Sequence, residues 1–162
     1  MNKGEEIILK IKQFLESFNI SYKYMEHEPT PTSEDAARVR GTNPEEGAKA
    51  IILKLSKTNK NVMVVLPGNL KINSKKVKQY LNDDISFEDP DLILQNYGVV
   101  VGGVPPFGNL LGSGIELLID NKLFLNEYIS FNCGEKTASI TMKADDYKKA
   151  INNVALIGDF AK

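Results

Sequence analysis

The sequence predicts a single mixed α/β (α+β) domain with a curved, largely antiparallel mixed sheet flanked by helices. Its 162 residues, 42% of them hydrophobic, suffice for one core without a disulfide or metal. Apolar residues recur at helical spacing near the N-terminus, and most later segments are short β-rich runs separated by turn residues. Because no repeat or domain boundary interrupts this pattern, we expect one domain over residues 1–162, with helix 1–19 packed on it.

The first two helices are predicted from a buried stripe and from a cap. Residues of about 4–18 place apolar side chains on one face, and Asn19 ends this helix. Thr32 or Ser33 offers a hydroxyl to cap a second helix that runs to about Val39. Acidic residues in its first turn suit the helix dipole.

Three further helices are expected over about residues 74–81, 90–96 and 144–152. The first is capped by Asn73 or Ser74 and turns Val77, Tyr80 and Leu81 inward. The second begins at Asp89-Pro90 and stops at Gly98. The third has acids in its first turn and lysines after them.

The predicted strands are short and rich in β-branched and aromatic residues. They cover residues 21–25, 48–55, 62–66, 85–87, 115–119, 128–131 and 139–142. A polar turn at 56–61 joins two of them into a predicted hairpin. The last ten residues carry enough apolar side chains to pack on the body of the domain.

Composition narrows the chemistry. The only cysteine, Cys133, excludes an intramolecular disulfide and a multi-cysteine metal site, and the only histidine, His27, makes a histidine metal centre or a Ser-His-Asp triad hard to build. We therefore expect no metal or cofactor. No apolar run has the length of a membrane span, and acids stand where a signal peptide would be apolar, so we expect a cytoplasmic protein that does not bind membranes.

The net charge of −1 hides an uneven distribution of charge. Residues 49–81 hold no Asp or Glu and eight lysines, at positions 49, 54, 57, 60, 71, 75, 76 and 78. The rest of the chain carries 12 basic and 21 acidic residues. This asymmetry fits either a surface for a phosphate-bearing partner or a solvated lysine face.

Residues 101–114 form a loop dense in glycine and proline. Glycine permits positive φ and close approach of a ligand to main-chain amides, while proline fixes the bend. Because apolar residues stand between the glycines, the loop differs from a flexible linker. It indicates either a shaped binding loop or a tight connection between strands.

Four motifs follow one another within residues 20–150. They are His27-Glu28-Pro29 with Thr32-Ser33-Glu34-Asp35-Ala36-Ala37, Gly47-Ala48-Lys49-Ala50, Gly102-Gly103-Val104-Pro105-Pro106-Phe107-Gly108, and Phe131-Asn132-Cys133-Gly134 ahead of Ala138-Ser139-Ile140. In order and spacing they resemble the YbaK and prolyl-tRNA-synthetase-associated editing domain family of aminoacyl-tRNA deacylases.

The resemblance implies a hydrolase that removes a wrongly attached amino acid from the 3′-terminal adenosine of tRNA, and at this length a free-standing one. It implies that Lys49 contacts the phosphate of that adenosine, and that Gly102 and Pro106 belong to the family's Gly-x-x-x-Pro motif. It also implies a reaction without a protein nucleophile, in which a ribose hydroxyl helps to place or activate water. The implied partner is the aminoacyl-tRNA 3′ end, and an aminoacyl-tRNA synthetase is a second candidate.

Main-chain amides of the loop are the predicted source of charge stabilisation. An aminoacyl ester is reactive, so positioning water and stabilising charge on the carbonyl oxygen can suffice. Gly103, Val104, Phe107 and Gly108 each keep an N–H, whereas proline does not. We expect donors on both sides of the prolines, with Pro106 helping to set the bend.

Further candidates come from the first motif. His27 titrates near neutrality and is a candidate general base, but it equally suits a turn that orders residues 29–33. Thr32 and Ser33 are expected to cap a helix, and their hydroxyls are candidates for lining the amino-acid pocket.

The last motif supplies the remaining candidates. Asn132, together with Phe107, is expected to line the pocket that selects the amino acid. Cys133, next to Gly134 in the same motif, is expected to be a pocket wall and not a nucleophile, since no histidine lies nearby in sequence. The substrate stays open among proline-, alanine-, cysteine- and serine/threonine-type amino acids.

Two other functions compete with deacylation. One is a non-catalytic module that docks tRNA or a synthetase through its lysines. The other is a binding domain for a small phosphorylated ligand with the loop as an anion nest, although no P-loop or dinucleotide fingerprint is present.

Overall fold

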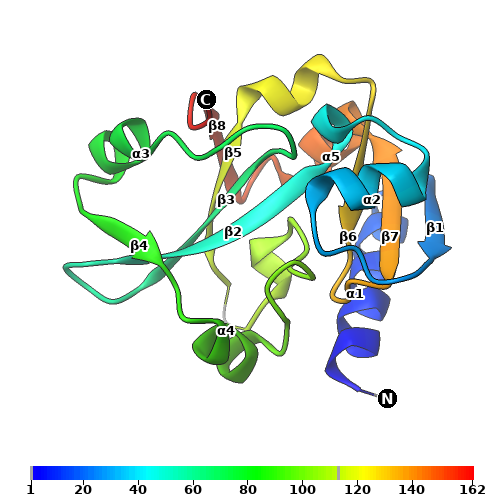
Figure 1. Ribbon diagram of the computed structural model, residues 1–162, viewed down its shortest axis with the longest axis horizontal. Coiled ribbons are helices and arrows are strands. Elements are labelled where there is room, and N and C mark those ends of the chain that lie inside the picture. Colours follow the sequence, from blue (N-terminus) through cyan, green and yellow to red (C-terminus); the bar gives the residue numbers. More distant parts are fainter. Residues whose placement is uncertain (1, 113) are drawn as a thin grey trace.

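Helices and strands are interspersed along the chain in the computed structural model, which describes residues 2–112 and 114–162 (Figure 1). The helices are α1 (Lys3–Ser17), α2 (Ser33–Arg40), α3 (Ser74–Leu81), α4 (Pro90–Tyr97) and α5 (Ala144–Ile151). The strands are β1 (Tyr22–Glu26), β2 (Ala48–Leu55), β3 (Asn61–Pro67), β4 (Ile85–Phe87), β5 (Glu116–Asp120), β6 (Tyr128–Asn132), β7 (Ala138–Lys143) and β8 (Ala155–Gly158). Residue 113, inside the glycine- and proline-rich loop, lies outside the described part.

The strands form two sheets, so the predicted mixed α/β class is confirmed with one difference, since a single sheet was expected. One sheet has the order β1-β7-β6 and is antiparallel throughout. The other has the order β4-β2-β3-β5-β8, in which β2 pairs antiparallel with β3 and β4 while β5 pairs parallel with β3 and β8. The sheets meet at a parallel bridge between Gly47 and Ser130.

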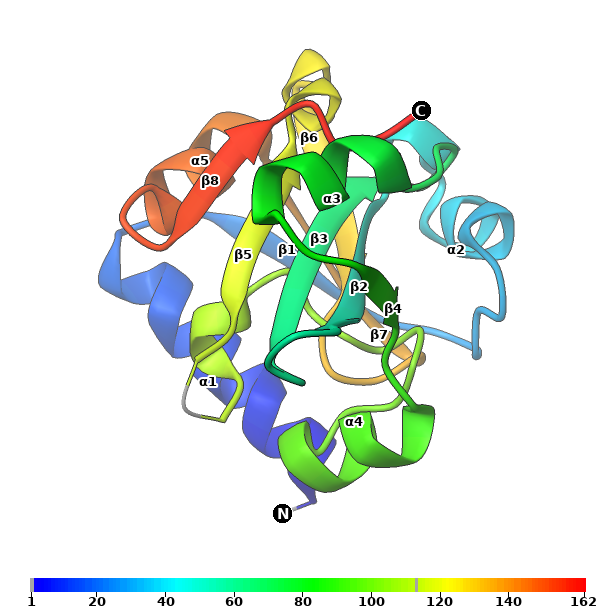
Figure 2. The ribbon, with the colours of Figure 1, turned by 90° about the vertical axis from the view of Figure 1, so that its left-hand side faces the viewer.

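Both faces of the five-stranded sheet are covered, because side chains of β3 alternate between two cores. Met63 and Val65 face the main core, which α1, the three-stranded sheet and α5 complete. Val62 and Val64 face a smaller core that holds Val77 of α3 and the C-terminal residues. Figure 2 shows α3 lying over this second face, in front of β3.

Local signals set the ends of the elements. Thr32 caps α2 by accepting from the Asp35 amide at 3.1 Å, and Asp89 caps α4 by accepting from the Asp91 amide at 2.7 Å. Gly98 ends α4 at φ +72°. The predicted hairpin of residues 48–55 and 62–66 is confirmed as β2 and β3.

Two expectations about packing differ from the structure. Tyr80 was expected to point inward but is 48% exposed, because the short helix α3 buries only Val77 fully and leaves the tyrosine ring against the edge of Phe160. The tail does pack on the body, as expected, but it adds the strand β8, which the sequence did not reveal. No helix of residues 2–112 and 114–162 combines the length and apolar character needed to cross a bilayer.

Candidate functional site

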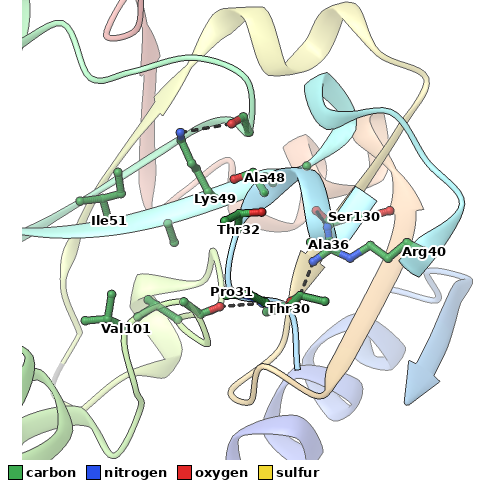
Figure 3. Close-up of a pocket in the computed structure, with 17 residues that line it drawn as sticks. Thr30, Pro31, Thr32, Ala36, Arg40, Ala48, Lys49, Ile51, Val101 and Ser130 are labelled. Carbon is green, nitrogen blue, oxygen red and sulfur yellow. Dashed lines mark hydrogen bonds between the residues drawn. The ribbon is translucent and has the colours of Figure 1, made fainter. Parts of the chain in front are cut away.

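A cavity of about 220 Å³ lies where the two sheets meet (Figure 3). Four segments far apart in sequence form its wall: residues 30–36 leading into α2, residues 47–51 at the start of β2, the loop at 101–104, and residues 130–132 of β6. Each segment overlaps one of the four motifs found in the sequence, and Arg40 and Gly68 complete the wall.

Lys49 enters the cavity from the start of β2. Its Nζ donates to the carbonyl of Gly68 at 3.3 Å, and Figure 3 shows the side chain extending to that turn, away from Arg40. Burial and the nearby charge of Lys71 lower the pKa of Lys49. An ammonium that is partly desolvated and bound only to a carbonyl is ready to exchange that acceptor for an anionic ligand.

Arg40, at the end of α2, is a second cation in the wall that the sequence analysis missed. It donates from Nε to Ser139 Oγ at 2.9 Å, from Nη2 to Asn132 Oδ1 at 2.8 Å and from Nη1 to the Ser130 carbonyl at 3.5 Å. Burial lowers its pKa to about 10, so it is charged at neutral pH. The sequence did contain one signal for Arg40. Arg38 pairs with Asp35, three residues earlier on the helix, whereas the residues three and four positions before Arg40 are alanines, so Arg40 has no acidic partner within its own helix.

The first half of the loop forms one side of the cavity. Val101, Gly102 and Val104 line it. Gly102 has φ +88°, and its carbonyl accepts from Asn132 Nδ2 at 2.6 Å. The Gly103 amide donates to the Val100 carbonyl at 2.9 Å, while that of Val104 meets no main-chain acceptor within the described residues. Of these two predicted donors, Val104 is therefore the one whose amide is not already bonded to a main-chain acceptor within the described residues.

The second half of the loop is anchored in the core. Phe107 is fully buried, with edge-to-face contacts to Phe14, Phe131 and Tyr147. Phe107 was predicted to line the pocket; it does not line this cavity, because its apolar ring is buried in this aromatic cluster. Pro106 also lies away from the wall, and its carbonyl accepts from the Tyr147 hydroxyl at 2.7 Å.

Gly108 is held next to the start of β5. Its carbonyl accepts from the Ile115 amide at 3.0 Å, and a Cβ at this position would lie 2.7 Å from the Ile115 carbonyl oxygen. Glycine is therefore required here for close main-chain packing, and Gly108 does not line the cavity. Amide donors were expected on both sides of the prolines, but only residues before the prolines line this cavity.

Thr32 and Ser33 lie in the wall, at the beginning of α2. The Thr32 hydroxyl takes part in the cap and also donates to Asp35 Oδ2 at 2.8 Å. Ser33 packs against Gly68, where an added Cβ would lie 3.2 Å from the serine Cβ. Both expected functions of these residues, capping and lining, are compatible with this placement.

His27 lies outside the cavity but is linked to it. One ring nitrogen, Nδ1, is 2.7 Å from the Glu28 carbonyl, and Nε2 is 2.7 Å from Ser139 Oγ. Ser139 donates in turn to Asn132 Oδ1 at 3.1 Å, and Asn132 lines the cavity. His27 is thus placed two hydrogen bonds behind the wall, too far back for direct contact with a ligand in the cavity.

Cys133 and Gly134 support the wall from the core. Cys133 was expected in the pocket wall, but it is 0% exposed and does not line this cavity, because its side chain lies in the main core. Burial raises the pKa of its thiol to about 12, which keeps it protonated and unreactive. Gly134, at φ +97°, donates its amide to the Gly103 carbonyl at 2.8 Å and ties the loop to the end of β6.

The described lining residues include two cations and several hydroxyls but no Asp, Glu, His or Cys. A cavity of this kind favours a negatively charged group and offers neither a carboxylate base nor a nucleophilic thiol. Water activated within it would have to rely on main-chain groups, hydroxyls and groups of the ligand itself.

Sequence comparisons relate this chain to proteins of aminoacyl-tRNA editing. The family model described as "Aminoacyl-tRNA editing domain" matches residues 27–150. The multifunctional Ser/Thr-tRNA deacylase ProXp-y of Escherichia coli (strain K12) is 25% identical over 151 residues, which cover 91% of this chain and 89% of that protein. The prolyl-tRNA editing protein ProX of Acetoanaerobium sticklandii is 23% identical over 154 residues, covering 93% and 92%. The crystal structure of the hypothetical protein APE2540 superposes with a TM-score of 0.84 at 21% identity, over 94% of this chain and 99% of that one.

Proposed function

The chain belongs to the aminoacyl-tRNA editing domain family, and from that premise we propose that it is a trans-editing deacylase that hydrolyses the ester of a mischarged tRNA. The observation that carries the proposal is the shared cavity of Lys49 and Gly102, which lie on different elements and line one hollow. The two relatives named as editing proteins support it, because the similarity extends over nearly their whole length.

In this proposal Lys49 binds the phosphate of the terminal adenosine. The tRNA phosphate replaces the Gly68 carbonyl as the acceptor of its ammonium. The ester then lies along the 101–104 wall, where the Val104 amide is available to its carbonyl oxygen.

The reaction transfers water to the ester carbonyl. The water oxygen bonds to the carbonyl carbon, the bond from that carbon to the ribose oxygen breaks, and the ribose oxygen takes a proton. The products are the free amino acid and a tRNA with its 3′-terminal hydroxyl restored. Because the described lining has no carboxylate or imidazole, a neighbouring ribose hydroxyl is the group best placed to orient the water.

The residues that line the cavity bear on the size and polarity of the amino acid that it admits. Thr30, Ser33, Ser130 and Asn132 line the cavity together with Ala48 and Ala50, so its wall combines small and polar residues. Such a surface suits a small amino acid, and the proposal therefore centres on serine, threonine, alanine, cysteine and proline esters.

The test is a panel of tRNAs charged with each of these amino acids and incubated with the protein. Release of labelled amino acid from one or two of them is expected, with Lys49→Ala greatly reduced. Lys23→Ala serves as a control, because Lys23 is exposed on β1 and does not line the cavity. Binding of these tRNAs without release would contradict deacylation and favour a non-catalytic tRNA-binding module.

A further inference from the structure

Arg40 is a half-buried cation held by neutral groups. No Asp or Glu oxygen lies within 4.0 Å of it among the described residues, in contrast to Arg38, which pairs with Glu28 and Asp35. Its three hydrogen bonds go to a hydroxyl, an amide oxygen and a main-chain carbonyl. Partial burial of a guanidinium without a carboxylate partner costs free energy, which leaves room for a role of Arg40 beyond stability.

The partners of Asn132 determine which way its side-chain amide faces. Arg40 can only donate and the Gly102 carbonyl can only accept. Asn132 Oδ1 must therefore face Arg40, at 2.8 Å from Nη2, and Nδ2 must face Gly102, at 2.6 Å from its oxygen. Ser139 Oγ also donates to Oδ1, at 3.1 Å, but a hydroxyl can accept as well as donate. Without the guanidinium, only the Gly102 carbonyl would oppose a flip of the Asn132 amide.

The bond to Gly102 controls the orientation of the cavity wall. The carbonyl of Gly102 and the amide of Gly103 belong to one peptide plane, which is fixed at one end by Asn132 and at the other by the Val100 carbonyl. The following residue, Val104, carries the available amide. The peptide that carries this amide is held in turn at the Gly103 carbonyl by the Gly134 amide, at 2.8 Å, so Asn132 and Gly134 together fix the 101–104 wall.

We propose that Arg40 is a positioning residue of the editing site: it orients the Asn132 amide, which holds the Gly102 carbonyl and with it the 101–104 wall of the cavity. This inference rests on the proposed function. Arg40 acts through Asn132 and does not contact the reacting ester.

The first test needs no substrate. In ¹⁵N-labelled protein, Arg40→Met should shift the side-chain amide signals of Asn132 and the main-chain signals of Gly102 and Gly103, whereas Arg38→Met should not. Arg38 is a matched control because it lies on the same helix, is exposed and points away from the cavity. Unchanged Asn132 and Gly102 signals in Arg40→Met would overturn the proposal.

The second test measures deacylation of the tRNA identified by the panel. Arg40→Met should lower kcat roughly 10- to 100-fold and change KM little, because a misplaced wall affects the reacting ester and not the tRNA body. Arg40→Lys, which keeps the charge and one donor, should recover part of the loss. Asn132→Asp accepts from Arg40 but cannot donate to Gly102, and it should lower kcat to a similar degree.

A double mutant separates positioning from an independent effect. If Arg40 acts through Asn132, Arg40→Met should cost little more once Asn132→Ala is present. An equal loss in both backgrounds would overturn the proposal. Should Arg40→Met fail to fold, Arg40→Lys and Asn132→Asp decide it by the same signals. If the wild-type protein releases no amino acid, the proposed function fails, and the NMR measurement still decides the positioning.

Discussion

Gly102→Ala is the sharpest single test of the cavity wall. Gly102 has φ +88°, a conformation that costs an L-residue about 1–2 kcal/mol. The added Cβ would lie 3.0 Å from Lys136 Cε, the mobile end of a long side chain, so steric conflict adds little. For a chain of 162 residues this destabilisation corresponds to a fall in Tm of about 2–8 °C.

The effect on activity should be much larger than the effect on stability. Relief of the strain moves the 102–103 peptide, whose carbonyl is held by Asn132, and displaces the donor at Val104. A displacement of about 1 Å at a reacting centre costs on the order of 100-fold in rate. We expect a loss of that size in kcat/KM for deacylation at a temperature where the variant is folded.

Gly98→Ala is the matched control. Gly98 has φ +72°, and an added Cβ would lie 3.2 Å from side-chain carbons of Lys3, so the backbone strain and the nature of the contact are similar. It caps α4 and does not line the cavity. Both variants should lose similar stability by thermal unfolding, but only Gly102→Ala should lose activity. Wild-type activity in Gly102→Ala, or equal losses in both, would refute the assignment of the wall.

Three further predictions concern separate parts of the molecule. Lys49→Ala should weaken binding of the tRNA end and reduce the slope of log K against log salt concentration by about 0.7, as measured by titration at several salt concentrations; an unchanged slope would argue against a phosphate contact. Asp120→Asn should lower the free energy of unfolding in urea by about 1–3 kcal/mol, because the buried carboxylate accepts from the amides of Phe160, Ala161 and Lys122, and a stability equal to wild type would contradict this. The thiol of Cys133 has its pKa raised from 9.0 to about 12 by burial, so the native state retains this proton longer than the unfolded state. Stability relative to Cys133→Ala should therefore be constant below pH 9 and fall between about pH 9 and 12, by up to roughly 1.4 kcal/mol per pH unit; a difference independent of pH would show that the thiol is not responsible.

The elements that the sequence predicted well are those with strong local signals. The strand expected at 48–55 is observed at Ala48–Leu55, because an apolar run too short for a core helix, with turns at both ends, suits a largely buried strand. The helix expected after Asp89-Pro90 is observed up to Gly98, because the cap, the proline and the glycine each act within a few residues.

The features that the sequence did not reveal depend on distant contacts. The strand β8 pairs parallel with β5. Parallel strands are joined by long connections and not by a short turn, so no local sequence signal marks this pairing. Asp120 is fully buried, and its carboxylate accepts from main-chain amides 40 and 41 residues later. The hydrogen-bond partners of Arg40 lie 90 or more residues away in the sequence.

The sequence predicted which segments form the candidate site but not how their side chains are arranged around the cavity. The motifs placed Lys49, Gly102 and Asn132 in the same function, and all three line one cavity. They did not show that the loop divides after Val104, with Phe107 buried in the core. A phenylalanine among glycines and prolines is compatible with a pocket wall or a core anchor, and only the surrounding aromatic rings distinguish the two.

The cavity exists because small residues occupy the join between the two sheets. Gly47 and Gly68 bring β2, the turn after β3 and the start of α2 together. The Gly68 amide donates to the Gly47 carbonyl at 2.8 Å. A Cβ on Gly68 would lie 2.7 Å from the Pro44 carbonyl oxygen, so a larger residue would force these segments apart. Ala48 and Ala50 then leave a hollow between β2 and the loop that larger side chains would fill. The volume open to the amino acid is therefore set by main-chain contacts outside the motifs as much as by the residues within them. Proteins that share these motifs can accordingly differ in the amino acid they admit.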